Sequence, residues 1–133
     1  MSYLIDTDII IYSLKNNETV RDNFAKYANA LKAISVISYG ELLLGALRSQ
    51  QITRNTAVVR RIAGLFPIIE VSSPVMETFA EIKAALLSRG SPLDDMDLII
   101  ASTALIHNLA LVTNNARHFA RVPGLKIENW AKK

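Results

Sequence analysis

The sequence predicts an α/β fold built around a mainly parallel central sheet. Two observations indicate this fold: short, continuous apolar runs recur along the chain, and segments whose apolar residues have helical spacing lie between them. Continuous apolar runs are typical of strands that helices cover on both faces. Strands and helices that alternate in this way are typical of parallel sheets. Functional groups in such sheets collect beyond the carboxyl ends of the strands, so we expect a site at that edge.

The predicted strands and helices follow one another without a linker. The four clearest apolar runs are YLI at residues 3–5, AISVI at 33–37, PIIEV at 67–71 and LALV at 109–112. A last short strand is expected at 125–129. The helical spacing predicts helices at 18–31, 38–50, 54–65, 74–89 and 95–107. Because no repeat or flexible segment divides the chain, we expect one domain over residues 1–133.

The composition excludes several kinds of site. The chain has no cysteine, so disulfides, thiolate metal sites and cysteine nucleophiles are excluded, and only His107 and His118 remain as nitrogen ligands. Any metal is therefore expected to be a hard, oxygen-bound cation. No apolar stretch approaches the roughly 18 residues of a membrane span, and the N-terminus lacks the pattern of a signal peptide. We expect a cytoplasmic protein with no membrane partner.

The charges predict an acidic site within a basic surface. The net charge is +3, from 15 lysines and arginines and 12 aspartates and glutamates. Half of the acids fall in three motifs that we expect to converge, namely Asp6, Asp8, Glu41, Asp94, Asp95 and Asp97. Outside these motifs the bases clearly outnumber the acids. A cation-filled cleft in a basic surface suits a phosphate-chain substrate, because the cation neutralises the reacting phosphate.

The first acidic motif is YLIDTDIIIY at residues 3–12, in which Asp6 ends a strand and Asp8 follows two residues later. Two carboxylates so close repel each other unless a cation or a proton intervenes. The alternative explanation is capping of the next helix, since aspartate is a favoured N-cap residue. We expect a site role for Asp6 and capping for Asp8.

The second motif is ISVISYGELLLG at residues 34–45. Ser38 and Glu41 have the S-x-x-E spacing of a capping box, which by itself explains both residues. Gly40 and Gly45 each cost the helix up to about 1 kcal/mol relative to alanine, which indicates that a strand, a second subunit or substrate approaches closely. The helix is apolar nearly all round, and we expect it to be buried in the core.

The third motif begins with a turn at residues 90–92, after which the sequence reads LDDMDLIIASTAL. Asp94 or Asp95 is expected to cap the helix, and Asp97 lies in its first turn. One aspartate is sufficient as a cap, and the helix dipole stabilises a further charge by less than about 1 kcal/mol. We therefore expect Asp97 in the site and structural roles for Asp94 and Asp95.

The motifs together resemble VapC-type toxins of the PIN-domain ribonuclease family. The resemblance rests on YLIDTDIIIY, ISYGELLLG, DDMDLIIASTAL and LVTNNARHFARVPGLKIENW, in this order and over nearly the whole chain. It implies a three-layer α/β/α sandwich with a mainly parallel sheet of four to five strands. It also implies RNA hydrolysis that depends on Mg²⁺ or Mn²⁺, a homodimer, and inhibition by a small antitoxin.

The resemblance places the three acids of the family at Asp6, Glu41 and Asp97. On this basis Asp6 and Asp97 are expected to bind the metal directly or through water, and Glu41 to bind a second cation or to position the attacking water. The position two residues after the first acid is commonly asparagine in similar sequences and is Asp8 here. Asp8 is therefore expected to support the loop.

The chain departs from the family after the last core strand. Many relatives have a fourth acid there, whereas this chain has Asn114, Asn115 and His118. This difference leaves the choice between one and two protein-bound metals open. Asn115 is expected to orient a metal-bound water through its side-chain amide.

The combined prediction is an endoribonuclease that cuts RNA with water. Similar sequences cut the anticodon stem-loop of initiator tRNA, so the resemblance implies tRNA as the substrate. One alternative is a phosphohydrolase in which Asp6 attacks phosphorus and Asp8 acts as the acid, a chemistry that requires a lysine nearby. The other is a non-catalytic module that binds RNA or a partner.

Overall fold

The computed structural model describes residues 1–133 and contains a five-stranded sheet in which every pairing is parallel. The strands are β1 (Tyr3–Ile5), β2 (Lys32–Ser35), β3 (Ile68–Ile69), β4 (Ala110–Val112) and β5 (Ile127–Glu128). Their order across the sheet is β3-β2-β1-β4-β5. The predicted parallel sheet of four to five strands is confirmed. The strand order reverses between β1 and β4, which is where parallel sheets bind ligands.

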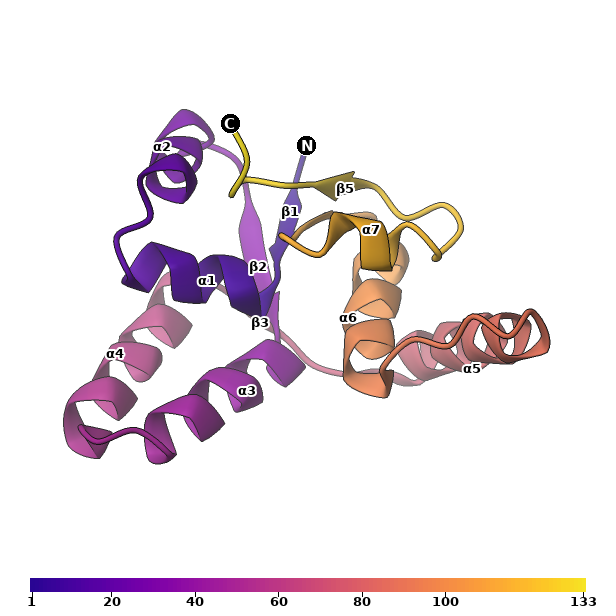
Figure 1. The fold of residues 1–133 in the computed structure, drawn as a ribbon, viewed down its shortest axis with the longest axis horizontal. Coiled ribbons are helices and arrows are strands. Elements are labelled where there is room, and N and C mark those ends of the chain that lie inside the picture. The colour runs from indigo at the N-terminus through magenta and orange to yellow at the C-terminus, as the bar shows by residue number, and fades with distance from the viewer.

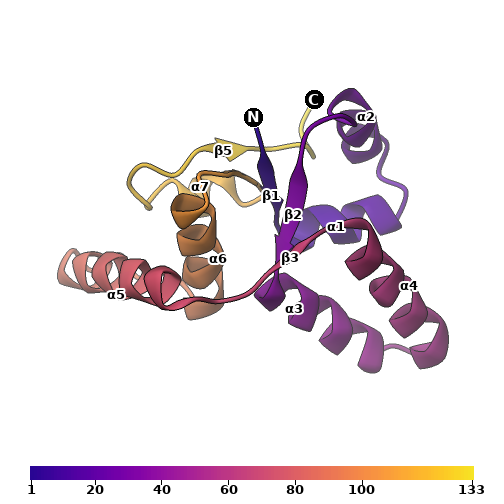
Figure 2. The same cartoon turned by 180° about the vertical axis from the view of Figure 1, so that it is seen from behind.

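Seven helices cover the two faces of this sheet. They are α1 (Thr7–Leu14), α2 (Glu18–Lys26), α3 (Val36–Leu47), α4 (Ile52–Leu65), α5 (Ser73–Ser88), α6 (Asp95–Ile106) and α7 (Ala116–Phe119). Helices α1 to α4 lie on one side of the sheet, and α5 to α7 lie on the other (Figures 1 and 2). The three-layer α/β/α arrangement that the resemblance implies is therefore present.

The central strand β1 contributes to a separate hydrophobic cluster on each of its faces. Tyr3 and Ile5 pack in the cluster that contains Trp130, whereas Leu4 packs in the cluster that contains Leu98. Successive strand residues point to opposite faces, so burial on both faces requires the uninterrupted apolar run that the sequence shows. This packing fixes the end of β1 and, with it, the position of the next residue along the chain.

The junction of β2 and α3 differs from the prediction. The strand expected at 33–37 ends at Ser35, whose hydroxyl oxygen accepts a hydrogen bond of 3.0 Å from the backbone N–H of Ile37. Ser35 is thus the N-cap, and α3 begins before the predicted helix at 38–50. A single serine that follows an apolar run can end the strand and start the helix, because its side chain satisfies a free N–H of the first turn.

The predicted capping box of Ser38 and Glu41 is wrong. Both residues lie inside α3, and the Oγ atom of Ser38 is buried without a hydrogen-bond partner. The role of N-cap belongs to the serine three residues earlier. Capping therefore does not explain Glu41.

One of the alternatives for the two glycines of α3, and the expected burial of the helix, are also wrong. No atom from elsewhere in the chain lies within 4 Å of a Cβ built on Gly40 or Gly45, so no strand approaches the helix there. Leu44 and Leu47 are each 57% exposed, so the helix is not buried all round. The helix packs only through one face, which includes the buried Leu42. Its opposite face is apolar and open.

The remaining differences concern the ends of elements and two short helices. Helices α1 and α7 are not among the predicted ones, because α1 has a continuous apolar run and α7 is only about one turn long. Helix α2 ends at Lys26, earlier than the predicted 18–31, because residues 27–30 form turns and a bend before β2. No helix combines the length and hydropathy needed to span a membrane.

Candidate functional site

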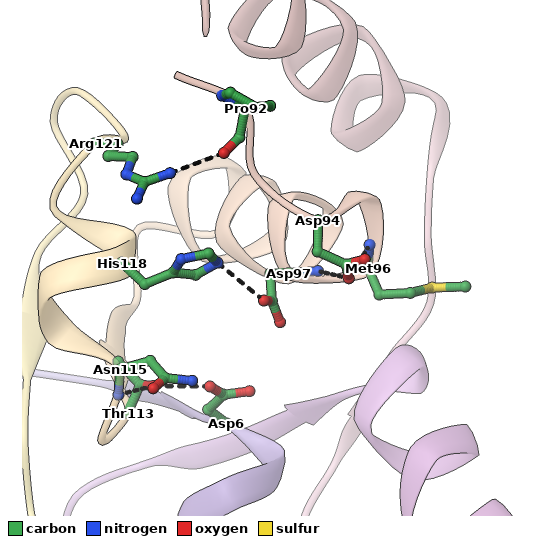
Figure 3. Close-up of polar contacts among 9 residues, drawn as sticks. All are labelled: Asp6, Pro92, Asp94, Met96, Asp97, Thr113, Asn115, His118 and Arg121. Atoms are coloured by element: carbon green, nitrogen blue, oxygen red, sulfur yellow. Dashed lines mark hydrogen bonds and ion pairs between the residues drawn. The ribbon is translucent and has the colours of Figure 1, made fainter. Parts of the chain in front are cut away.

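The candidate site lies at the carboxyl ends of β1 and β4, and Asp6 occupies its floor. This residue follows β1 directly, N-caps α1 and is 5% exposed. Its Oδ1 atom accepts a hydrogen bond of 2.8 Å from the backbone N–H of Thr7. Its Oδ2 atom accepts another of 2.8 Å from the hydroxyl of Thr113, which follows β4 (Figure 3). Because β1 and β4 are paired, the carboxylate is held at a fixed place at the point where the strand order reverses.

Asp8 lies two residues further on, in the first turn of α1. Its Oδ2 atom accepts a hydrogen bond of 3.1 Å from the backbone N–H of Asn114, so it ties α1 to the segment after β4. This contact agrees with the supporting role predicted for Asp8. The capping role expected for Asp8 is wrong, because the N-cap of α1 is Asp6. The Oδ1 atom of Asp8 is buried and has no partner. An oxygen in this state lacks the donor or cation that buried carboxylates normally have.

The three aspartates of the third motif have different roles. Asp94 caps α6, because its Oδ2 atom accepts hydrogen bonds from the backbone N–H groups of Met96 and Asp97. Asp95 forms an exposed ion pair of 2.6 Å with Lys83 of α5. Asp97 points toward Asp6 (Figure 3), and it is the one of the three whose charge raises the pKa of Asp6. The structure therefore separates the capping and surface aspartates from the one expected in the site.

The electrostatics show that Asp6, Asp8 and Asp97 form one cluster. Burial, followed by the charges of Asp8 and Asp97, raises the pKa of Asp6 from 3.8 to about 7. Burial also raises the pKa of Asp8, and the charge of Asp97 adds to this rise. The pKa of Asp97 is raised by burial, which outweighs the lowering effect of the nearby His118. Three desolvated carboxylates that oppose one another's ionisation favour a cation between them.

Glu41 reaches the same edge from α3. Its Oε1 atom accepts a hydrogen bond of 2.7 Å from the hydroxyl of Thr7, the residue between the two aspartates of the first motif. The side chain is exposed, and its charge is not among those that raise the pKa of Asp6. Glu41 therefore lies at the rim of the site, whereas Asp6 lies at its floor.

Sequence reasoning missed the two threonines that hold these acids. Thr7 positions Glu41, and Thr113 positions Asp6, each through a hydroxyl that donates to a carboxylate. The available signal was a polar residue directly after an apolar strand, which Thr113 shares with Asp6. Its partner, 107 residues away along the chain, follows only from the strand pairing.

Comparison with known proteins agrees with this arrangement. A family model described as PIN domain matches residues 3–125. This chain belongs to the PIN-domain family. Its relatives are in the VapC group of that family, and one is the tRNA(fMet)-specific endonuclease VapC of Shigella flexneri. The two sequences are 33% identical over 132 residues, which cover 98% of this chain and 99% of the relative.

Chains in solved structures of VapBC2 and of another toxin–antitoxin complex have the same fold. The match to VapBC2 from Rickettsia felis, bound to a DNA fragment from its promoter, has a TM-score of 0.91 at 32% identity and covers 98% of this chain and 99% of that one. A toxin–antitoxin complex from Klebsiella pneumoniae matches with a TM-score of 0.77 at 28% identity, over 97% and 98% of the two chains. The PIN fold thus extends over almost the whole chain.

The oxygen donors of this PIN domain suit a divalent cation that keeps most of its water ligands. No three or more histidine, aspartate or glutamate side chains form a ready group of metal ligands. Mg²⁺, however, is usually held by one or two carboxylates and keeps several waters. The unpartnered Oδ1 atom of Asp8 and the carboxylates of Asp6 and Asp97 supply hard oxygen donors of this kind. The residues fit a largely hydrated cation.

Asn114 lies in the segment after β4, where the expected fourth acid is missing, and it has a mainly structural role. Its backbone N–H binds Asp8, its side-chain amide donates to the hydroxyl of Tyr12, and its Oδ1 atom accepts from Asn129. The side chain of Asn115 is exposed and makes no hydrogen bond to an acid of the site. The water-orienting role of Asn115 stays a prediction.

A basic cleft of about 310 Å³ adjoins the carboxylates of this PIN domain. We use this name for the cleft lined by Asn114, Asn115, Arg117, His118, Arg121 and Lys132, together with Ala116. It meets the acidic cluster where the Nε2 atom of His118 lies 3.2 Å from the Oδ2 atom of Asp97. By contrast, no lysine is among the hydrogen-bond or ion-pair partners of Asp6 or Asp97, as an aspartate-nucleophile phosphohydrolase would require.

Proposed function

We propose that this protein is a divalent-cation-dependent endoribonuclease toxin that hydrolyses RNA phosphodiester bonds and is neutralised by a cognate antitoxin. The observation that carries the proposal is the cluster of desolvated carboxylates at Asp6, Asp8 and Asp97, with Glu41 at its rim. Its position between β1 and β4 is the expected ligand site of a parallel sheet. The endonuclease and toxin–antitoxin relatives support the same reaction and partner.

We assign the catalytic roles to Asp6, Glu41 and Asp97. Asp6 and Asp97 would hold the cation, and Mg²⁺ or Mn²⁺ fits their hard oxygen donors. When bound, the cation supplies charge neutralisation at the scissile phosphate and makes a coordinated water more acidic. Asp6 contributes a carboxylate already fixed by Thr7 and Thr113, so little ordering is needed when substrate binds.

Glu41 has a different role because it is exposed and not part of the buried cluster. We propose that Glu41 orients the attacking water or binds a second cation that arrives with the RNA. The hydrogen bond from Thr7 keeps its carboxylate directed across the start of α1. The buried Asp8 is a supporting residue, since one of its oxygens binds the backbone N–H of Asn114.

The substrate we propose is tRNA, with the anticodon stem-loop of an initiator tRNA as the first choice. Support comes from the Shigella flexneri relative, a tRNA(fMet)-specific endonuclease. The basic cleft supports a polyanion, because Arg117, Arg121 and Lys132 line it together with His118, which contacts Asp97. A single-stranded loop exposes the backbone more fully than a closed duplex and suits such a cleft.

The partners and location follow from the same assignment. We propose that the protein is a cytoplasmic homodimer that binds a small antitoxin and cleaves tRNA when no antitoxin is bound. We also propose that residues 1–133 form a single PIN domain, since the family model covers residues 3–125.

The test is cleavage of purified tRNA in the presence of Mg²⁺, Mn²⁺ or EDTA. Initiator and elongator methionine tRNA serve as the two substrates. We expect cleavage of the initiator tRNA with either metal, no cleavage with EDTA, and loss of activity by Asp6→Asn, Glu41→Gln and Asp97→Asn. Asp95→Asn is the matched control, because Asp95 belongs to the same helix turn as Asp97 but pairs with Lys83. Cleavage that survives EDTA or the Asp97→Asn change would contradict the proposal.

A further inference from the structure

An apolar pocket of about 370 Å³ lies between α3 and the first turn of α6. We use this name for the hollow lined by Val36, Ile37, Gly40, Leu44 and Met96, together with Glu41. Its volume is at the lower end of the range for small-molecule sites, which is about 300–1,000 Å³. One wall of the apolar pocket is thus a carboxylate of the candidate site, and the other walls carry no charge.

Gly40 makes this face of α3 hollow. Ile37 lies three residues before it and Leu44 four residues after it, so the three residues share one face of the helix. A Cβ built on Gly40 has no atom within 4 Å, and its φ angle is not positive. Neither a close contact within the chain nor the backbone conformation requires glycine here, although glycine destabilises a helix relative to alanine. Of the explanations that the sequence leaves open, a second subunit and substrate remain, and both approach from outside the chain.

The carboxylate of Asp97 lies between this pocket and the basic cleft. Asp97 contacts His118, which lines the basic cleft. Its neighbour along the chain, Met96, lines the apolar pocket. In the view of Figure 3 the side chains of His118 and Met96 lie on opposite sides of Asp97. An RNA strand whose phosphates follow the basic cleft to the acids would therefore bring its next nucleoside to the apolar pocket.

We propose that the apolar pocket holds one nucleobase of the RNA substrate, namely the base next to the scissile phosphate on the side away from the basic cleft. This inference rests on the proposed function, and it names the place where a base of that substrate binds. A base has flat faces that fit between aliphatic side chains, and the thioether of Met96 packs favourably against aromatic rings. No side chain of the lining donates a hydrogen bond, so the pocket accepts a base by shape and does not select one by its edge.

A second copy of this chain is the other possible occupant, and the charge of Glu41 argues against it. In a twofold dimer both subunits present the same surface, so a contact centred on this pocket brings the Glu41 carboxylates of the two copies together. Like charges repel, and no other residue of the lining has a positive charge that would offset the repulsion. A nucleobase is uncharged and avoids this cost.

The test fills the pocket and removes the base in turn. Gly40→Leu places a side chain in the hollow at an exposed position of α3, where leucine favours the helix more than glycine does. Gly45→Leu is the matched control, because it makes the same change at another exposed glycine of α3 that does not line the pocket. The substrate is the anticodon stem-loop of initiator tRNA, either intact or with one abasic nucleotide at successive positions of the loop.

With Mg²⁺ we expect one abasic position to lower kcat/KM of the wild-type protein by about tenfold, within the range for the loss of a stacked base. Gly40→Leu should lower kcat/KM for the intact RNA by a similar factor. It should also remove the effect of that abasic position, because both changes abolish the same contact. Gly45→Leu should match the wild-type protein on every RNA. The Kd of the RNA, measured in the Asp97→Asn background, should follow the same pattern.

Three results would overturn the inference and leave the proposed function standing. The first is a wild-type protein that cleaves every abasic RNA as well as the intact one, a result that does not depend on the folding of any variant. The second is an equal kcat/KM for Gly40→Leu and Gly45→Leu. The third is a wild-type dimer that Gly40→Leu converts to a monomer in light scattering, which would assign the pocket to a second copy.

A different result would contradict the proposed function itself. If the wild-type protein cleaved neither the intact stem-loop nor whole tRNA with Mg²⁺ or Mn²⁺, the nuclease assignment would fail, and the base-binding role would fail with it. Cleavage of the intact RNA therefore tests the function, and the comparison of abasic with intact RNA tests the pocket.

Discussion

The hydroxyl of Thr113 donates a hydrogen bond of 2.8 Å to the Oδ2 atom of Asp6, and this contact links the ends of the paired strands β1 and β4. Both residues are buried. The bond lowers the pKa of Asp6, but burial and the neighbouring carboxylates raise it by more. Thr113 therefore stabilises the ionised form of an acid that its surroundings otherwise keep protonated.

The first prediction concerns Thr113→Val. A hydrogen bond to a charged group contributes about 1.5–3 kcal/mol, and one between neutral groups contributes less. We expect the substitution to lower the free energy of unfolding more at pH 8, where Asp6 is ionised, than at pH 5, where it is protonated. Urea unfolding of the cation-free protein at both pH values measures the difference.

Thr103→Val is the matched control for this prediction. Thr103 is also buried, but its hydroxyl donates to the backbone carbonyl of Ile99, which does not titrate. The control should lose the same free energy at both pH values. If Thr113→Val also lowered the free energy of unfolding equally at both pH values, the strength of the hydrogen bond would not depend on the charge of Asp6.

The second prediction is that the cation-free protein loses stability as the pH rises from about 4 to about 7. In the unfolded chain Asp6 loses its proton near pH 3.8, whereas in the folded protein it stays protonated up to about pH 7. The folded state binds more protons, so the free energy of unfolding falls with pH and levels off above the folded pKa. One pKa unit corresponds to about 1.4 kcal/mol, so Asp6 alone accounts for about 4 kcal/mol. Asp8 and Asp97 add to the fall, because their pKa values are raised as well.

Urea unfolding across this pH range, with EDTA or with Mg²⁺, measures the effect. A cation present at 100 times its Kd adds about 2.7 kcal/mol, and it should restore stability mainly above pH 7 because it binds the ionised carboxylates. Asp6→Asn should flatten the profile and make the cation-free protein more stable at pH 8. A stability that rises between pH 4 and pH 7 in EDTA would contradict the raised pKa of Asp6.

The sequence was sufficient to predict the buried strands and the acids that follow them, because local rules govern both. An apolar run that ends in Asp6 must leave the sheet at that residue, and Asp97 exceeds what its helix needs as a cap. The capping box at Ser38 was wrong because the helix begins three residues earlier, where the hydroxyl of Ser35 accepts from the N–H of Ile37, so Ser38 lies inside the helix. Two residues that could each cap one helix cannot be ranked without knowing where the strand ends.

Contacts between distant segments were beyond sequence reasoning. The bonds from Thr113 to Asp6 and from Thr7 to Glu41 depend on which strands and helices are neighbours. Helix α3 shows the same limit in its packing, since its all-round apolar pattern predicts burial while Leu44 is more than half exposed. A pattern of apolar residues shows which surfaces avoid water, but it does not show whether this chain or another covers them.

The third prediction is that Thr7→Val lowers the rate of tRNA cleavage by about tenfold. An effect of this size is expected when a catalytic group loses the hydrogen bond that positions it. The Thr7 hydroxyl donates to Glu41 on the exposed rim, so its removal frees that side chain. The rate constant at saturating tRNA should fall while KM changes little. Thr53→Val, at an exposed threonine of α4, is the control and should leave the rate unchanged. Equal rates for Thr7→Val and the control would remove Glu41 positioning from the mechanism.

The fourth prediction is that the basic cleft binds the RNA backbone rather than the bases. Arg117 and Lys132 are exposed and line the cleft, and neither has an ion-pair partner, so their charges are available to phosphates. Each phosphate contact releases condensed counterions, and its loss reduces the slope of log K against log salt by about 0.7–0.9. The double variant Arg117→Gln and Lys132→Gln should therefore weaken binding to all tRNAs alike and lower the slope by about 1.5.

Binding is measured with Asp97→Asn as the background, so that no tRNA is cut. Arg89→Gln, at the C-cap of α5, removes one charge that does not line the cleft and should change neither quantity. A variant that loses affinity for one tRNA only, with an unchanged salt slope, would show that these side chains read sequence instead.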